Sequence, residues 1–186
     1  RGRNPLPLEV IKPSVSLGGI AMITLAFKID ESNSDFEQLK KRFLEIYRNN
    51  IAKHTRLFDG MEKILSTLES KKIPWGVVTN KASWLTQPLM QELELSQRTN
   101  CIVSGDTLEF SKPHPAPLFH ACELLQCKAE DTLYVGDAER DIEAGNSAAM
   151  TTLIASYGYI DKNTDTDKWR ADGKVDSPLE LLNWII

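Results

Sequence analysis

Four short apolar runs, separated by helical patterns, constrain the fold of this chain more than any other feature of its sequence. They are IPWGVVTN (73–80), NCIVSG (100–105), TLYVGD (132–137) and TTLIAS (151–156). Short, continuous apolar strands that alternate with helices are typical of a parallel sheet covered on both faces. The sequence therefore predicts an α/β fold with a doubly wound, Rossmann-like parallel sheet.

Helical patterns fill the intervals between the runs. Apolar residues recur at helical spacing around 61–68, 85–95, 118–125 and 142–149. Pro88 lies inside the second of these segments and is expected to kink or restart that helix. A last helix is expected to begin at Ser177-Pro178-Leu179-Glu180, which has the form of a capping box with proline at the first helical position.

The first part of the chain carries no strong strand signal before about residue 70. Apolar residues instead recur at helical spacing over 17–28 and again over 34–52. The sequence therefore predicts an all-helical segment ahead of the sheet. We expect its two helices to pack together over the carboxyl edge of the sheet and to join the core near 54–59.

Composition and charge exclude several classes of protein. The chain has 186 residues, 41% of them hydrophobic and 26% charged, which suits one globular domain with at most a small insertion. A net charge of −4 gives no broad attraction to nucleic acid or to an anionic membrane. No apolar run approaches a membrane span, and the first residues lack the apolar core of a secretory signal. The three cysteines form no Cys-x-x-Cys pair, so we expect reduced thiols and a cytoplasmic location.

Polar residues follow three of the predicted strands. Thr79 and Asn80 end the first, Lys112 lies beyond the second, and Asp137 and Asp141 follow the third. Ligands of parallel α/β sheets bind at the carboxyl ends of the strands, so these side chains are expected to converge there. Carboxylate oxygens suit Mg²⁺, while a lysine and a hydroxyl suit the oxygens of a phosphoryl group.

Other polar and aromatic residues have simpler interpretations. The histidines and cysteines between 114 and 127 fit no common zinc pattern. Trp75 and Phe119 are expected to pack rather than to stack on a substrate. Gly136 is expected to let the backbone turn tightly before Asp137. The polar stretch DKNTDTDKWRADGK (161–174) is expected to be a solvated loop near the edge of the site.

The ordered motifs identify a resemblance. Thr79 at a strand end, Lys112 in a Lys-Pro-x-Pro-x-Pro context and Gly136-Asp137-x-x-x-Asp141 resemble motifs two, three and four of the haloacid dehalogenase superfamily of phosphohydrolases. The likeness runs from about residue 5 to the end and is strongest to the phosphoglycolate phosphatase group. Within that group, WGVVTNK (75–81) and YGYI (157–160) resemble the branch that contains N-acetylmuramic acid 6-phosphate phosphatase.

The resemblance implies a role for each residue of the motifs. Thr79 and the amide of Asn80 would bind the phosphoryl oxygens, and Lys112 would neutralise the phosphate and the nucleophile. Asp137 would bind Mg²⁺ directly, with Asp141 in support. The resemblance also implies two regions, a partial helical cap at 1–56 and a Rossmann-like phosphatase core at 57–186.

The chain departs from the family pattern at its start. Family members begin with a strand that leads into Asp-x-Asp-Gly-Thr, whose first aspartate is the nucleophile and whose second is the general acid and base. This motif does not occur here, and we expect it to lie upstream of Arg1. The first central strand would then be missing between the strands at 74–79 and 132–136. Three outcomes are possible: these strands close up, another chain inserts a strand, or a segment that the sequence does not include supplies it.

These observations lead to one main hypothesis and two alternatives. The main hypothesis is a Mg²⁺-dependent phosphatase of a small phosphorylated metabolite, of the phosphoglycolate or N-acetylmuramic acid 6-phosphate class, acting through an aspartyl-phosphate. The chain as written is then expected to be inactive. The alternatives are a sugar phosphomutase of the same fold and a truncated, non-catalytic phosphate-binding protein. A signalling receiver domain is disfavoured because receivers place their acids before the threonine and lysine. Neither nucleic acid nor a membrane is an expected partner, and no oligomeric state is indicated.

Overall fold

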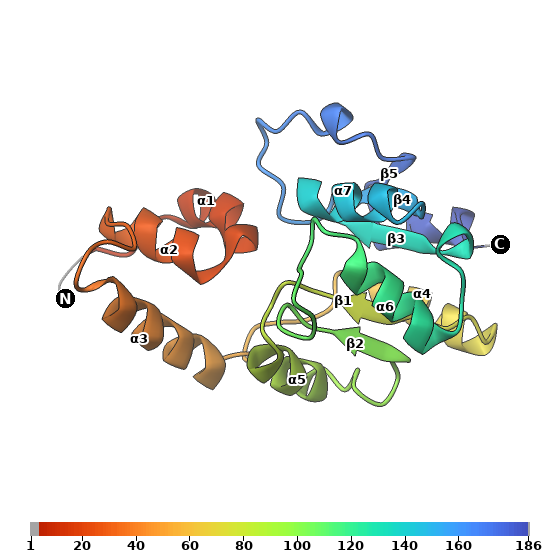
Figure 1. Cartoon of the computed structure of the whole chain (residues 1–186), viewed down its shortest axis with the longest axis horizontal. Coiled ribbons are helices and arrows are strands. Elements are labelled where there is room, and N and C mark those ends of the chain that lie inside the picture. The colour runs from red at the N-terminus through yellow and green to blue at the C-terminus, as the bar shows by residue number, and fades with distance from the viewer. Residues whose placement is uncertain (1–3, 186) are drawn as a thin grey trace.

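The computed structural model describes residues 4–185. Residues 1–3 of the predicted cap (1–56) and residue 186 of the predicted core (57–186) therefore lie outside the described residues. The described strands are all parallel and form two sheets (Figure 1). One sheet pairs β1 (Gly76–Val78) with β2 (Cys101–Val103), and the other has the order β3 (Leu133–Gly136), β4 (Thr151–Ala155), β5 (Gly173–Val175). The predicted α/β fold with parallel strands is confirmed.

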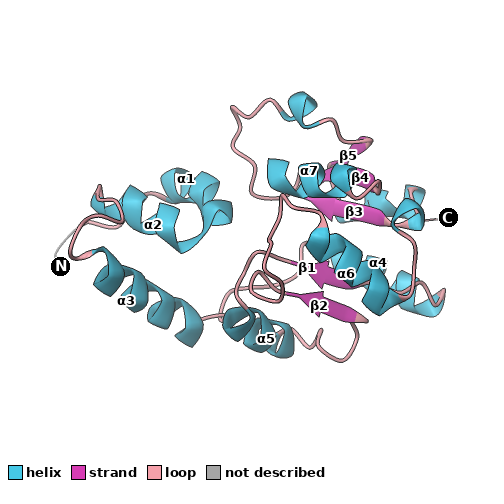
Figure 2. Cartoon of the chain, viewed as in Figure 1, coloured by secondary structure: helices cyan, strands magenta, loops and turns pink. Residues whose placement is uncertain are grey.

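Helices separate the strands along the chain, as the sequence patterns predict (Figure 2). The α-helices of the core are α4 (Met61–Ser70), α5 (Ser83–Glu92), α6 (Ala116–Leu125) and α7 (Glu139–Ser147). Short 3-10 segments are η2 (Ala129–Asp131), η3 (Thr166–Trp169) and η4 (Pro178–Asn183). Over residues 4–185, no helix is both long and apolar enough to cross a membrane.

Neighbouring strand residues point to opposite faces of the sheets, and helices cover both faces. Val78 and Tyr134 pack with the apolar side chains of α6 and α7. Val77 packs on the other face with side chains of α4 and α5, and Val135 packs there with α4 and η4. This two-sided burial explains why the strands read as continuous apolar runs rather than as alternating ones.

A helical unit precedes the core, and it consists of α1 (Leu8–Ile11), η1 (Lys12–Leu17), α2 (Gly18–Phe27) and α3 (Phe36–Asn49). Helices α2 and α3 pack against each other, with Ile23 and Phe36 fully buried. Figure 1 shows this unit beside the core and connected to it by a single segment after α3. The division at residues 56 and 57 stays a prediction.

Within residues 4–185 the two sheets are not hydrogen-bonded to each other, so β1 and β3 each have an edge without a strand partner among these residues. Two backbone hydrogen bonds flank β1: Thr79 N–H donates to Val103 O, and Asn100 N–H donates to Trp75 O. Odd-numbered positions along this strand, Val77 among them, therefore direct their backbone groups to β2. The backbone groups of Gly76 and Val78 therefore point the other way. Of the three outcomes considered from the sequence, the one in which these flanking strands close up is not seen over the described residues.

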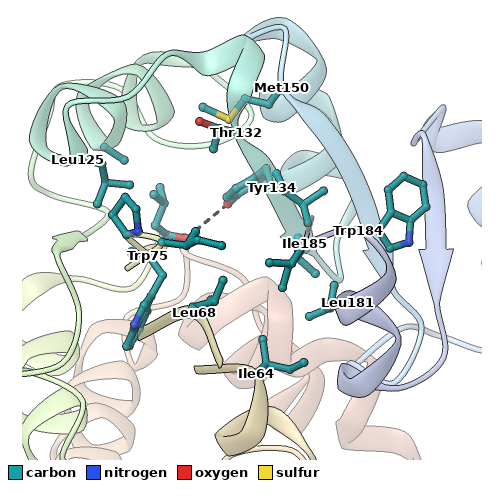
Figure 3. Close-up of a pocket in the computed structure, with 18 of the residues that line it drawn as sticks. Ile64, Leu68, Trp75, Leu125, Thr132, Tyr134, Met150, Leu181, Trp184 and Ile185 are labelled. Atoms are coloured by element: carbon teal, nitrogen blue, oxygen red, sulfur yellow. Dashed lines mark hydrogen bonds between the residues drawn. The ribbon is translucent and has the colours of Figure 1, made fainter. Parts of the chain in front are cut away.

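An apolar cavity of about 720 Å³ lies between the facing edges of β1 and β3 (Figure 3). Side chains from α4, α6 and the C-terminal segment line it, among them Leu68, Leu125 and Ile185. Trp75 Nε1 also lies here, and it is buried without a hydrogen-bond partner among the described residues. We call this cavity the β1–β3 opening.

Three details differ from the sequence predictions. The stretch 161–174, predicted as a loop, contains η3 and runs into β5, which pairs with β4. Pro88 does not divide α5, which is continuous. The last helix starts as predicted but is a 3-10 helix, and Ser177 Oγ donates to Glu180 Oε1 instead of capping the backbone.

Candidate active site

Lys112 is the centre of a buried polar cluster at the carboxyl edge of β1 and β3. Its ammonium donates to Val78 O at 2.7 Å and to Tyr134 Oη at 2.9 Å. It also forms an ion pair with Asp141 Oδ1 at 2.9 Å. An ammonium has three N–H donors, so these three partners use all of them. The residues that the sequence placed on separate strand ends therefore meet at one edge.

Asn80 holds the backbone of Lys112 in place. Its side-chain amide donates to Lys112 O at 2.8 Å, and its carbonyl oxygen accepts from Lys112 N–H at 3.1 Å. Thr79 lies beside it and accepts the N–H of Lys81 at 3.1 Å through Oγ1. The side chain of Asn80 thus positions Lys112. The predicted contact of Asn80 with phosphate would therefore be made by its backbone N–H.

The two aspartates of the cluster differ in their surroundings. Asp141 is buried and uses both oxygens, since Oδ1 pairs with Lys112 and Oδ2 accepts the N–H of Ala138 at 3.1 Å. Asp137 is less buried, and its Oδ2 accepts the N–H of Tyr159 at 2.8 Å. Asp137 is therefore the carboxylate better placed to offer an oxygen to a cation.

Glycines allow the close approach of both carboxylates. A Cβ at Gly136 would lie 2.3 Å from the Cβ of Asp141, and one at Gly158 would lie 2.4 Å from the Cβ of Asp137. Gly136 has no positive φ, so the predicted tight turn is not the reason for this glycine. Its role is to let the start of α7 pack directly against the end of β3.

Tyr134 is a member of the cluster that the sequence analysis missed. Its hydroxyl accepts from Lys112 and lies 3.5 Å from Val78 O, so the side chain reaches from β3 across the β1–β3 opening to β1 (Figure 3). Burial, and then the negative charge of Asp141, raise the pKa of Tyr134 well above its ordinary value. A signal was available: a tyrosine within a buried strand needs a partner for its hydroxyl.

The helical unit contacts the core through aromatic and cationic side chains. Lys81 Nζ donates to Tyr47 Oη at 2.8 Å and lies 4.5 Å from the centre of that ring. Lys12 lies over the ring of Tyr159 at 5.5 Å. Because Lys81 and Tyr159 follow the carboxyl ends of β1 and β4, the unit lies against the predicted edge of the sheet.

The donor set of the site suits a hard cation. Asp137 is placed to offer a carboxylate oxygen, with Asp141, whose two oxygens already have partners, in support. Mg²⁺ usually takes one or two carboxylates together with waters and substrate phosphate. Across residues 4–185, no group of three or more His, Cys, Asp and Glu side chains could hold a metal ion. The residues present therefore fit Mg²⁺ better than a metal that needs an all-protein ligand cage.

Comparison with known proteins gives a consistent result. Residues 15–155 match the family described as haloacid dehalogenase-like hydrolase. The chain is 40% identical to an N-acetylmuramic acid 6-phosphate phosphatase from Pseudomonas putida, over 97% of the chain and 81% of that protein. It is 38% identical to a phosphoglycolate phosphatase from Xanthomonas campestris pv. campestris, with the same coverage of 97% and 81%.

Solved structures show the same fold. A predicted phosphoglycolate phosphatase from Haemophilus somnus superposes with a TM-score of 0.87 at 22% identity, covering 100% of this chain and 85% of that one. A β-phosphoglucomutase from Clostridium difficile superposes with a TM-score of 0.70 at 18% identity, covering 97% and 80%. At these identities the structures speak for the fold alone.

Proposed function

The chain belongs to the haloacid dehalogenase-like hydrolases, and on that premise we propose that it is a Mg²⁺-dependent phosphatase of phosphoglycolate or N-acetylmuramic acid 6-phosphate. Its relatives of 33–40% identity are phosphatases named for these two compounds. The observation that carries the proposal is the cluster around Lys112, which places a buried ammonium next to carboxylates at the carboxyl edge of the strands.

Each residue of the cluster has a task in phosphoryl transfer. Thr79 Oγ1 and the Asn80 amide bind the non-bridging oxygens of the phosphate, and Lys112 balances their negative charge. Asp141 and Tyr134 hold the ammonium in place. Asp137, with Asp141 in support, holds Mg²⁺, which when bound neutralises charge on the transferring phosphoryl group.

The nucleophile belongs to a strand that fills the β1–β3 opening. A parallel strand there would pair with the free edges of both β1 and β3, and its carboxyl end would lie between Thr79 and Asp137. An aspartate at that end would attack phosphorus and form an aspartyl-phosphate as the P–O bond to the alcohol breaks, and the second aspartate of the same motif would donate the proton to the leaving oxygen. Water would then hydrolyse the acyl phosphate and release inorganic phosphate.

Other readings have less support. The mutase alternative rests on structural likeness at 18% identity, whereas the sequence relatives cited above are phosphatases. The proposed reaction needs only a small phosphomonoester as partner. A reducing cytoplasm is the location we propose, because the three cysteines are free thiols and two of them are buried in the apolar core.

The test is release of inorganic phosphate from the two candidate substrates and from an aryl phosphate, with Mg²⁺ and with EDTA. We expect no turnover by the 186-residue chain, and Mg²⁺-dependent turnover once an N-terminal extension supplies a strand that ends in Asp-x-Asp-Gly-Thr. Asp137→Asn should abolish this turnover. Asp131→Asn changes an exposed residue just before the amino end of β3 and should leave the turnover in place.

Two results would contradict the proposal. Failure of the extended chain to hydrolyse any phosphomonoester would remove the assigned activity and leave a non-catalytic phosphate-binding protein. Substantial turnover by the 186-residue chain alone would show that the nucleophile does not come from a strand in the β1–β3 opening.

A further inference from the structure

Lys81 lies between the phosphate-binding residues and the helical unit. Its N–H donates to Thr79 Oγ1, and its carbonyl oxygen accepts from Gly105 N–H at 2.9 Å and from Thr86 Oγ1 at 3.1 Å. Its ammonium reaches Tyr47 of α3 at 2.8 Å. The backbone of Lys81 is thus fixed next to the expected phosphate site, while its charge lies where the helical unit meets the core.

The ammonium of Lys81 has no acidic partner among the described residues. Its recorded contacts are the hydroxyl and ring of Tyr47, which are neutral, so two of its three N–H donors remain for a ligand. Lys112 differs, because its three donors are all directed to internal partners. Lys81 is also half-buried, which strengthens its attraction for an anion relative to an exposed lysine.

Other cations near this junction are less suited to bind a substrate. Arg48 lies 5.9 Å from the ring centre of Trp84, and Lys12 lies over Tyr159, but both Arg48 and Lys12 are exposed to solvent. Neither of these two residues belongs to the loop that carries Thr79. Of these three cations, Lys81 is the one that follows Thr79 and Asn80 directly in the chain and hydrogen-bonds to Thr79.

The two candidate substrates share one feature besides the phosphate ester: each carries a carboxylate. In phosphoglycolate it is the acid of the glycolate, and in N-acetylmuramic acid 6-phosphate it is the acid of the lactyl ether. We propose that Lys81 binds this second anionic group, so that the enzyme selects phosphomonoesters that also carry a carboxylate. This inference rests on the proposed phosphatase function and adds the substrate feature that Lys81 recognises.

A pair of sugar phosphates tests the inference directly. N-acetylglucosamine 6-phosphate differs from N-acetylmuramic acid 6-phosphate only by lacking the lactyl group. Binding of each is measured by titration calorimetry in EDTA with the 186-residue chain, and kcat/KM is measured with the extended, active form. We expect the carboxylated sugar to be preferred by about 10- to 100-fold, as a charge-assisted hydrogen bond allows.

Three variants separate recognition from structural support. Lys81→Met keeps the length of the side chain and should remove the preference by weakening only the carboxylated ligand. Tyr47→Phe removes the hydrogen bond from Lys81 to the helical unit but keeps the ring and the ammonium, and it should retain the preference. Lys71→Met, an exposed change at the end of α4, should leave both ligands unaffected.

The outcomes are distinct. If Lys81→Met weakens both sugar phosphates by the same factor, Lys81 only tethers the helical unit and the inference is wrong. It is equally wrong if the unaltered protein has no preference, or if Lys81→Met retains it. Failure of the extended chain to hydrolyse any phosphomonoester counts against the proposed function, while the binding preference still tests Lys81 by itself.

Discussion

At the scale of single residues, the ion pair of Lys112 and Asp141 places two opposite charges in the interior. Both side chains are nearly inaccessible, at 8% and 9% exposure, and their atoms are 2.9 Å apart. Each charge is tolerated at this depth because the other is present. Removal of one partner therefore leaves an uncompensated buried charge.

Lys112→Met should lower the free energy of unfolding by about 3–5 kcal/mol in urea denaturation, because Asp141 loses its cation. The double variant Lys112→Met/Asp141→Asn should recover a large part of this loss. Lys128→Met, which breaks an exposed pair with Glu130, should cost less than about 1 kcal/mol. A stability of Lys112→Met within about 0.5 kcal/mol of the unaltered protein would show that the pair is not buried as described.

Lys112→Ala in the extended, active form should lower kcat/KM by roughly 10²–10³ or more, because the phosphoryl charge loses its fixed cation. Lys128→Ala is the matched control and should leave kcat/KM unchanged. Turnover of Lys112→Ala close to that of the unaltered enzyme would reduce Lys112 to a structural residue.

Tyr134 should make stability depend on pH in the alkaline range. Its pKa is raised by burial first and then by the charge of Asp141, whereas in the unfolded chain it is about 10. Its contribution is therefore fully present below pH ~10 and is lost as pH rises above that value, because the unfolded chain releases a proton that the folded protein keeps. Urea denaturation between about pH 8 and 11 should show a steeper fall for the unaltered protein than for Tyr134→Phe. Identical slopes would contradict this assignment.

At the scale of secondary-structure elements, the contact between β3 and the start of α7 fixes the site. The Cβ of Asp141 lies where a side chain at Gly136 would be, so helix and strand touch without an intervening side chain. This contact aims Asp141 at Lys112. It depends on one glycine, which makes it directly testable.

Gly136→Ala should force α7 away from β3 and lower the free energy of unfolding by about 1–3 kcal/mol, the usual cost of overpacking. Gly19→Ala in α2 is the matched control, because a Cβ there meets only ordinary contacts at 3.6–3.7 Å with Phe43 and Leu44 of α3. It should be neutral or stabilising by roughly 0.5–1 kcal/mol. Equal effects of the two changes in thermal or urea denaturation would show that α7 and β3 are not in such close contact.

The sequence predicted elements better than it predicted contacts between them. The four apolar runs all became strands, because burial on both faces leaves a signal that is local in the chain. Strand β5 escaped prediction because Gly-Lys-Val is short and polar in part, and it forms only by pairing with β4. The brace from Asn80 to Lys112 and the contact of Lys81 with Tyr47 also escaped, since each joins residues more than thirty positions apart. The periodicity of apolar residues does not predict contacts between such distant residues.

At the scale of the whole molecule, the β1–β3 opening divides the core into two sheets that share no backbone hydrogen bond. Tyr134 and Lys112 span the division, since both reach Val78 O from outside the first sheet. The opening thus keeps its shape through side chains at the carboxyl edge and through helices that touch both sheets.

Native-state hydrogen exchange should reveal the two free edges as an alternating pattern. The amides of Gly76 and Val78 in β1, and of Leu133 and Val135 in β3, should exchange faster than those of Val77 and Tyr134, because their N–H groups face the opening. In the extended chain the pattern should disappear as a strand pairs with both edges. Uniform protection in the 186-residue chain would show that β1 and β3 are already paired.

The β1–β3 opening also determines how the molecule behaves in concentrated solution. Unpaired strand edges ordinarily template association between molecules, but here the two edges face each other across an apolar cavity bordered by Leu68 and Leu125. The outermost strands, β2 and β5, are only three residues long, so each offers few unpaired backbone groups to a strand of another molecule. A cavity between two strand edges has room to pair one extended segment but presents no outer edge to a sheet from a neighbouring molecule. We therefore expect colloidal stability close to that of a closed domain, combined with selective capture of single apolar strands.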